Sequence, residues 1–192
     1  ALSTRTLDKA KETLSAINPD VEIEAVPEYV TAKNVDPLVQ SSDIALDCAH
    51  NFDERNLLNA ACVRWRKPMV EAAMNSMEAY LTTIVPGKTP CLSCLFPEKP
   101  QWDRRGFGVL GIVSGTLACL AASEAIKQIT GFSKPLWSQL LTINLDGMEF
   151  AKRRPYHDLN CQVCGSLSRE LIADSIGTGN NLTTEVITAN SL

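Results

Sequence analysis

Apolar residues recur at helical spacing in three segments of the N-terminal half of the chain. The first predicts a helix over Leu7 to Ile17, which Asn18-Pro19-Asp20 ends. The others predict a short helix over Asn34 to Val39 and a longer one over Asp53 to Lys67. Four apolar side chains are expected to form the inner face of the longer helix: Leu57, Leu58, Ala61 and Trp65.

Short apolar runs between these helices have the composition of strands. Val21 to Ala25 alternates and predicts a strand. Asp43 to Cys48 is an apolar run with a polar end, which is typical of a buried parallel strand whose carboxyl end faces a ligand crevice. Pro68 to Ala72 is expected to be the next parallel strand, and Tyr80 to Val85 a further strand.

The C-terminal half adds one long helix and a hairpin. The helix is expected over Val109 to Ile129 and ends at Thr130-Gly131. Two apolar runs, Leu140 to Leu145 and Met148 to Lys152, flank Asp146-Gly147, a strong hairpin signal. Alternating strands and helices followed by a hairpin predict an α/β fold: an open sheet with an added antiparallel segment.

The composition suits one domain in a reducing compartment. The chain has 192 residues, 45% of them hydrophobic, and a net charge of -4, a mild acidic balance that disfavours nucleic acid as the main partner. The N-terminal stretch is charged, unlike a signal peptide, and Phe107 to Leu120 is too short to span a membrane. Cys48, Cys62 and Cys119 lie in apolar surroundings and are expected to be reduced core residues, which favours the cytoplasm.

Two pairs of cysteines have the spacing of metal ligands. They are Cys91-Leu92-Ser93-Cys94 and Cys161-Gln162-Val163-Cys164. Two thiolates from one tight turn can bind one metal, and two such turns complete a tetrahedron of sulfur that suits zinc. The site would clamp two remote segments together. Rubredoxin-like iron, ordinary disulfides and free buried thiols are the alternatives.

A polar cluster, Asp47 to Arg55 with Asn59 further on, marks the change from strand to helix. Helix N-termini favour anions, whereas carboxylates such as Asp47 and Asp53 could hold Mg²⁺. The alternative is helix capping by Asn51 or Asp53.

Taken in order, these segments resemble the ThiF/MoeB/HesA family, the bacterial relatives of ubiquitin-activating (E1) enzymes, and most of all its HesA-like branch. The resemblance runs from Leu7 to Gly165. It rests on Ile17-Asn18-Pro19, Leu46 to Arg55 with Asn59, the two cysteine pairs, Gly111 to Gly115, and Glu124-Ala125-Ile126-Lys127.

The resemblance implies a Rossmann-like fold that binds ATP and Mg²⁺, a structural zinc ion held by the four cysteines, and a homodimer. The implied reaction is adenylation of the C-terminal glycine of a ubiquitin-like sulfur-carrier protein. The family aspartate that assists magnesium and phosphate falls on His50, and Asp47 or Asp53 could take its place. Three residues are expected to bind the nucleotide: Asn51, Arg55 and Asn59.

The chain departs from the family pattern in ways that leave a second hypothesis open. The family's Gly-rich nucleotide loop is expected upstream, so residues 1–165 are interpreted as a partial domain and 166–192 as a tail with a short helix over Ser168 to Ile172. Gly106-x-Gly108-x-x-Gly111 is assigned to helix packing, and Thr6 stands where the family has a lysine. The alternative is a non-catalytic subunit that binds a ubiquitin-fold partner.

The crossover loop, Pro97 to Gly106, contains no cysteine. Relatives that form a thioester or persulfide use one there, so the chain resembles members that only adenylate. Arg104 and Arg105 could meet the acidic surface of a carrier.

Overall fold

The computed structural model describes residues 4–100 and 108–177, and the chain divides into two units, residues 1–31 and 32–192. In the first unit, helix α1 (Thr4–Ile17) confirms the predicted N-terminal helix. The strand predicted over Val21 to Ala25 is wrong, because these residues form neither helix nor strand. Alternation of apolar and polar residues alone does not make a strand. A strand also needs a neighbouring strand to hydrogen-bond with, and no described strand pairs with this segment.

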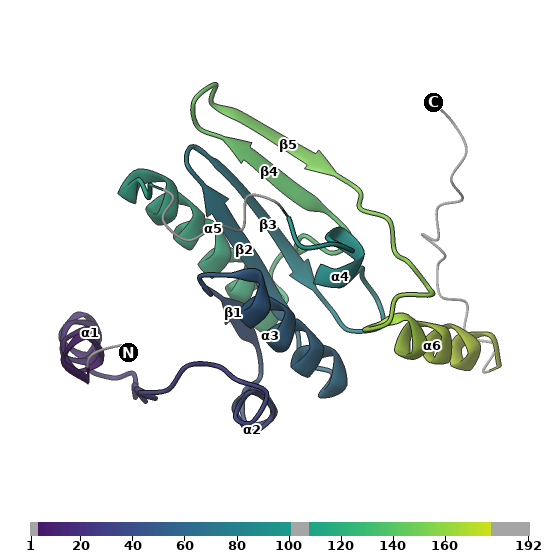
Figure 1. Ribbon diagram of the computed structural model, residues 1–192, viewed down its shortest axis with the longest axis horizontal. Coiled ribbons are helices and arrows are strands. Elements are labelled where there is room, and N and C mark those ends of the chain that lie inside the picture. The colour runs from purple at the N-terminus through teal and green to yellow at the C-terminus, as the bar shows by residue number, and fades with distance from the viewer. Residues whose placement is uncertain (1–3, 101–107, 178–192) are drawn as a thin grey trace. The chain divides into compact units, whose positions relative to one another are not determined.

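The second unit is built on a five-stranded sheet in the order β1-β2-β3-β4-β5 (Figure 1). Strands β1 and β2 pair in parallel, as predicted, and the remaining neighbours pair antiparallel. The α/β fold with an open, mixed sheet is therefore confirmed. The strands are β1 (Ala45–Asp47), β2 (Met69–Asn75), β3 (Glu78–Ile84), β4 (Leu140–Asn144) and β5 (Glu149–Arg153).

Helices cover both faces of this sheet. In Figure 1, α5 crosses behind β2 and β3, whereas α3 and α4 lie in front. The core on the α5 side is aliphatic and includes Val70, Leu81, Val113, Leu117 and Ile143. The helices of the second unit are α2 (Val35–Gln40), α3 (Phe52–Arg64), α4 (Leu92–Leu95), α5 (Gly111–Thr130) and α6 (Gly165–Gly177).

The predicted hairpin and helix end are confirmed in detail. Asn144 Oδ1 accepts hydrogen bonds from the backbone N–H groups of Asp146 and Gly147, which closes the turn between β4 and β5. Gly131 caps α5 with φ of 66°, a left-handed conformation that favours glycine.

The side chains that α3 buries differ from those predicted. Ala61 is fully buried, but Trp65 is 37% exposed, so its place on the inner face is wrong. Instead, the polar Arg55 and Asn59 are buried. The reason is that α3 packs against polar partners on the sheet and on α4 rather than against an aliphatic layer alone.

Two of the three cysteines outside the pairs were also misplaced. Cys62 is buried as expected, whereas Cys48 and Cys119 are exposed. Cys119 therefore lies on the side of α5 that faces away from the sheet. A Cβ added at Gly108 or Gly111 would have no neighbour within 4 Å, so within the described residues these two glycines do not serve helix packing.

The remaining expectations concern the chain's outer parts. Helix α6 is longer than predicted and packs onto the unit through buried Leu167 and Ser168. Arg104, Arg105 and Gly106 lie outside the described residues. Across residues 4–100 and 108–177, no helix has the length and apolar character needed to cross a membrane.

Candidate functional site

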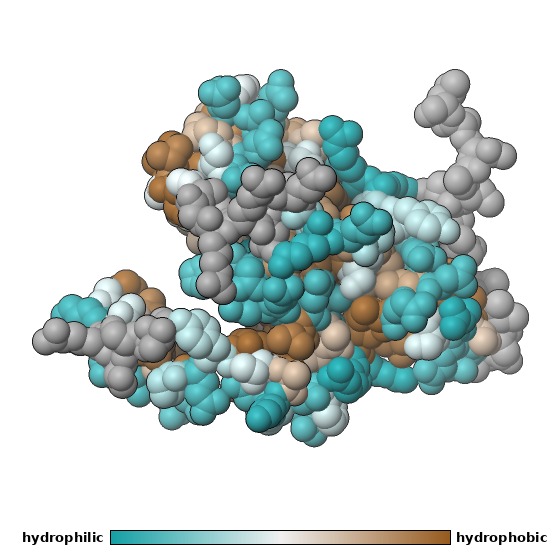
Figure 2. Space-filling view, in the orientation of Figure 1, coloured by the Kyte–Doolittle hydropathy of each residue, from teal (hydrophilic) through white to brown (hydrophobic). Residues whose placement is uncertain are grey.

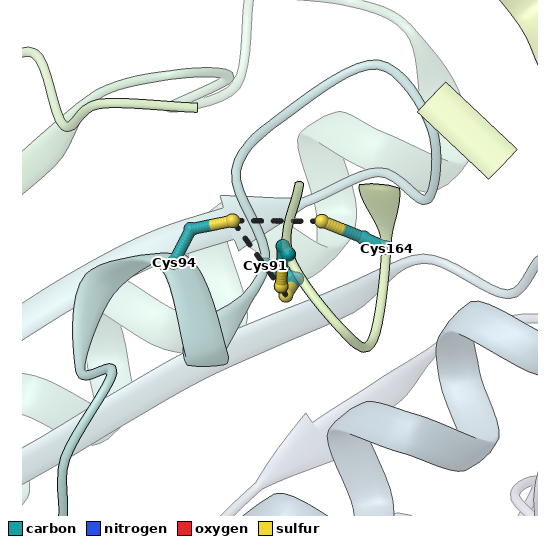
Figure 3. A group of neighbouring side chains, drawn as sticks. Cys91, Cys94 and Cys164 are labelled. Carbon is teal, nitrogen blue, oxygen red and sulfur yellow. Dashed lines mark hydrogen bonds between the residues drawn. The ribbon is translucent and has the colours of Figure 1, made fainter. Parts of the chain in front are cut away.

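The four paired cysteines converge on one point, although 70 residues separate the two pairs. Figure 3 shows Cys94 on α4, Cys91 close to it, and Cys164 opposite Cys94. All four sulfur atoms lie within 4.8 Å of one another, with Cys91 to Cys161 at 3.7 Å and Cys94 to Cys164 at 3.5 Å. All seven cysteines of the chain are free thiols rather than disulfides.

Tight turns aim each pair of sulfur atoms inward. Cys91 precedes α4, and its carbonyl accepts the backbone N–H of Cys94 at 3.0 Å. In the second turn the Cys161 carbonyl accepts the N–H of Gly165 at 2.9 Å. A Cβ on Gly165 would lie 2.4 Å from the carbonyl oxygen of Leu159, so this turn requires glycine.

The sulfur geometry fits one tetrahedral metal ion. A tetrahedron with metal–sulfur bonds of about 2.3 Å has edges of about 3.8 Å, close to the 3.5, 3.7 and 4.0 Å separations between sulfur atoms. Hydrogen bonds from Cys164 and Cys94 lower the pKa of Cys91 to about 4. The same contacts raise the pKa of Cys164. A bound cation would displace any protons left on these thiols.

Asp47 and Arg55, two residues predicted from the sequence, form a buried ion pair. Asp47 ends β1 and is 1% exposed. Its Oδ2 accepts from Arg55 Nη1 at 3.0 Å, and its Oδ1 accepts the backbone N–H of Ala49 at 2.8 Å. Arg55 Nη2 donates to the Ala49 carbonyl at 2.6 Å. The pair therefore fixes the loop that follows β1.

Glu71 and Tyr80 extend this network across the sheet, and the sequence did not reveal either. Arg55 Nη1 donates to Glu71 Oε1 at 3.1 Å, and the Tyr80 hydroxyl donates to the same oxygen at 2.9 Å. A lone acidic residue inside the apolar run of β2 was the available signal for Glu71. Tyr80 becomes its partner only through the antiparallel register of β2 and β3.

The surroundings of Glu71 favour its protonated form. Burial, and then a hydrogen bond with Asp47, raise the pKa of Glu71 well above its usual value. Its Oε2 is buried without a partner if both carboxyl groups act only as acceptors. A proton on Glu71 would lower the cost of burying its carboxyl group and would give that group a donor for the hydrogen bond with Asp47. The charges of Asp47 and Arg55 would then cancel. For Arg55, burial lowers the pKa, but Glu71 and Asp47 outweigh it and raise the pKa.

The other predicted residues have separate environments. Asn51 is the N-cap of α3, since its side chain accepts the backbone N–H of Glu54 at 2.9 Å. His50 and Asp53 are exposed, and Asp53 pairs with Lys99 at 3.1 Å. Asn59 is buried and binds the first cysteine turn, where its Oδ1 accepts the N–H of Leu92 at 3.0 Å. The structure thus brings together Asp47 and Arg55, but not His50 and Asp53.

A cavity of about 460 Å³ lies on the sheet face opposite α5. Tyr80 and Phe96 form one end of it, and strands β4 and β5 contribute Thr142, Glu149 and Arg153. Tyr80 also contacts Glu71, so the cavity borders the buried network.

Outside the cavity, hydrophobic side chains gather over the first turns of α5 (Figure 2). Three of them are more than 45% exposed: Val109, Leu110 and Ile112.

His157 is a further residue beside the four cysteines that the sequence did not single out. Its Nε2 lies 3.0 Å from Ser168 Oγ and 3.8 Å from Cys164 Sγ. Burial lowers the pKa of His157.

Comparisons with known proteins agree with this architecture. Residues 4–164 match the ThiF family. The chain is 71% identical over 177 residues to the heterocyst HesA protein of Trichormus variabilis, a match covering 91% of this chain and 66% of that protein. It is 35% identical over 178 residues to the SAMP-activating enzyme E1 of Haloferax volcanii, covering 90% and 65%.

The fold is also that of E. coli MccB, solved with ATP. The TM-score is 0.69 at 24% identity, and the match covers 85% of this chain and 51% of MccB. At that identity the likeness concerns the fold alone. The chain spans about two thirds of the length of the HesA protein and the archaeal enzyme. Because the family match extends over most of its residues, the chain belongs to the ThiF family.

Proposed function

We propose that this chain is part of an enzyme that uses Mg·ATP to adenylate the C-terminal glycine of a ubiquitin-like sulfur-carrier protein. The observation that carries the proposal is the position of Asp47 at the carboxyl end of β1, beside the start of α3. Ligands of open α/β sheets bind outside the carboxyl ends of parallel strands. The family membership and the 35% identity to an enzyme named for SAMP activation support it.

The proposed reaction joins two anions, which the protein must hold together. The carrier's terminal carboxylate attacks the α-phosphate of Mg·ATP, giving an acyl-adenylate and pyrophosphate. Asp47 and Arg55 neutralise each other and hold the loop of residues 48–51. We assign them a positioning role, because each already has its hydrogen-bonding partners in the network.

His50 and Asp53 of the same turn are exposed. Asp53 has the carboxylate oxygens that Mg²⁺ prefers, so it fits a role in holding the cation. His50 fits phosphate contact better than magnesium, as a hydrogen-bond donor. The N-terminus of α3, capped by Asn51, adds a partial positive charge suited to phosphate. Asn59 serves this site by orienting α3.

The metal in the clamp is proposed to be zinc, in a structural role. Four protein sulfurs complete its coordination shell and leave no open position for substrate or water. Because sulfur geometry alone does not separate zinc from iron, elemental analysis of the purified protein decides between them. A reducing compartment such as the cytoplasm suits the seven free thiols.

The carrier's extended C-terminal tail is proposed to occupy the cavity between Tyr80 and the β4–β5 hairpin. The cavity has both apolar wall and polar rim, as a peptide tail requires. A homodimer is also proposed, since the outer side of α5 exposes Ile112, Ile126 and Ile129.

A second candidate function is a non-catalytic subunit that binds a ubiquitin-fold partner. Two observations favour it. His50 stands at the position of the family aspartate, and both carboxylate oxygens of Asp47 already accept hydrogen bonds, from Arg55 and from Ala49.

The test is ATP–pyrophosphate exchange with candidate ubiquitin-fold carriers, on this chain and on the full-length gene product. Exchange that requires a carrier ending in glycine would support adenylation. Its absence from the full-length protein, with carrier binding retained, would overturn adenylation in favour of the binding subunit.

A further inference from the structure

His157 and Ser168 contact the fourth cysteine of the clamp without belonging to the ligand set. His157 Nε2 lies 3.0 Å from Ser168 Oγ and 3.8 Å from Cys164 Sγ. Ser168 is fully buried in the first turn of α6, and His157 is half-buried. Their contact is therefore shielded from water. In such a buried place each polar hydrogen needs an acceptor from the protein.

The single hydroxyl proton of Ser168 determines which nitrogen of His157 carries hydrogen. Ser168 Oγ donates to the carbonyl of Cys164 at 2.9 Å. Since a hydroxyl has one proton, Oγ can only accept at its contact with His157. In this arrangement the ring nitrogen is the N–H donor, which corresponds to the Nε2–H tautomer.

The same N–H faces the sulfur of Cys164. The 3.8 Å separation lies within the range of hydrogen bonds to sulfur. A metal-bound cysteine is a thiolate, which attracts an N–H group and repels a nitrogen lone pair. The contacts with Ser168 and with Cys164 therefore select the same tautomer. A nitrogen that carries hydrogen has no lone pair for a metal, which excludes His157 as a ligand through this atom.

We propose that His157 is a positioning residue of the metal clamp, donating an Nε2–H···Sγ hydrogen bond to the Cys164 thiolate while Ser168 holds its ring. The inference rests on the proposed metal in the clamp. Four thiolates around a divalent ion leave an excess of negative charge, and this hydrogen bond withdraws part of it from one sulfur. It also fixes the direction of that sulfur toward the metal. Loss of such outer partners typically weakens metal affinity about 10–100-fold.

The test compares the wild-type chain with three variants. His157→Leu removes the donor, His157→Gln keeps an N–H donor at similar reach, and Tyr156→Phe is the control at an adjacent, 79% exposed side chain. Zinc affinity is measured by competition with a chromophoric chelator. We expect about 10–100-fold weaker binding in His157→Leu, recovery of most of it in His157→Gln, and no change in Tyr156→Phe.

Cobalt spectra and nitrogen NMR report on the N–H···S hydrogen bond itself. A residue that only stabilised the fold would not affect them. The thiolate-to-cobalt charge-transfer band should shift in His157→Leu but not in Tyr156→Phe. NMR of the zinc-loaded wild type should show hydrogen on Nε2, a result that does not require any variant to fold.

Three outcomes would overturn the inference, and they separate it from the clamp itself. Failure of the wild type to bind metal would overturn the clamp and this inference together. Unchanged zinc affinity and cobalt spectrum in His157→Leu would overturn the inference alone. Hydrogen on Nδ1 in the zinc-loaded wild type would do the same.

Discussion

The side chain of Asn59 accepts a hydrogen bond from the backbone N–H of Leu92 at 3.0 Å, which joins α3 to the first cysteine turn. Asn59 is 1% exposed, and its amide nitrogen also lies 3.4 Å from Ser93 Oγ. One turn earlier on the same helix, Arg55 holds Asp47. The cysteine cluster and the candidate nucleotide site are thus both connected to α3.

Replacing Asn59 should loosen this connection. In Asn59→Leu the buried N–H of Leu92 loses its acceptor, which should cost about 1–3 kcal/mol of unfolding free energy. Urea unfolding measures the loss. Asn56→Leu, at an exposed position of the same helix, should change stability by under about 0.5 kcal/mol. Equal stability of the two variants would contradict the role of Asn59.

The raised pKa of Glu71 leads us to expect a particular pH dependence of the free energy of unfolding. Because burial raises its pKa in the folded state, the folded protein binds more protons than the unfolded chain at pH values above the ordinary 4.5. The contribution of Glu71 to stability should therefore fall as pH rises from 4.5 toward the raised pKa. Glu71→Gln, which mimics the protonated acid, should remove this component.

The measurement is the difference in unfolding free energy between the wild type and Glu71→Gln across that pH range. The wild type should lose stability relative to the variant as pH increases. A difference that is flat, or that slopes the other way, would mean that Glu71 is ionised in the folded protein.

Another buried acidic side chain, Glu124, connects α5 to the sheet. It is 2% exposed, and its Oε2 accepts from Thr83 Oγ1 at 2.8 Å and from the backbone N–H of Leu136 at 2.6 Å. Lys127 pairs with its other oxygen. Glu124→Ala should destabilise the fold by about 3 kcal/mol, because it leaves these donors without an acceptor.

An exposed ion pair provides the matched control for Glu124. Glu12 pairs with Lys9 at 2.9 Å on the surface of α1. Because solvent screens this pair, Glu12→Ala should cost under about 0.5 kcal/mol. Thermal melting of both variants checks the contrast, and similar losses would argue against the assigned role of Glu124.

Two glycines should respond in opposite ways to alanine. A Cβ at Gly165 would collide with the backbone of Leu159, so Gly165→Ala should cost about 1–3 kcal/mol and weaken metal binding. Gly115, inside α5, has nothing within 4 Å of an added Cβ. Gly115→Ala should therefore stabilise the protein by about 0.5–1 kcal/mol. Chemical denaturation of both variants, with zinc titration of the first, tests the pair.

Features encoded by local spacing could be predicted from the sequence. The cysteine pairs converge as expected, with all four sulfur atoms within 4.8 Å of one another, and each turn aims its own two sulfur atoms. The Asp146-Gly147 hairpin was recognisable because its turn chemistry lies within a few residues. Helix α3 could also be located, because its apolar spacing and its N-cap lie within one short segment.

Features that depend on pairing between distant segments were missed. Val21 to Ala25 alternates like a strand but has no described neighbour to pair with. Tyr80 reaches Glu71 only through the β2–β3 register, and His157 reaches Cys164 only once the second cysteine turn has formed. Apolar neighbours in sequence did not reveal that Cys119 lies on the outer side of its helix.

The most direct test of the account is the metal content of the purified chain, because the proposed metal would join the two cysteine turns and the proposed role of His157 depends on it. The wild type, purified under reducing conditions, should hold about one zinc ion per chain. Cys94→Ser and Cys164→Ser should lose metal and melt at lower temperature, since metal binding energy is also folding energy. A wild type without stoichiometric metal, or serine variants with unchanged zinc content and melting, would contradict the clamp.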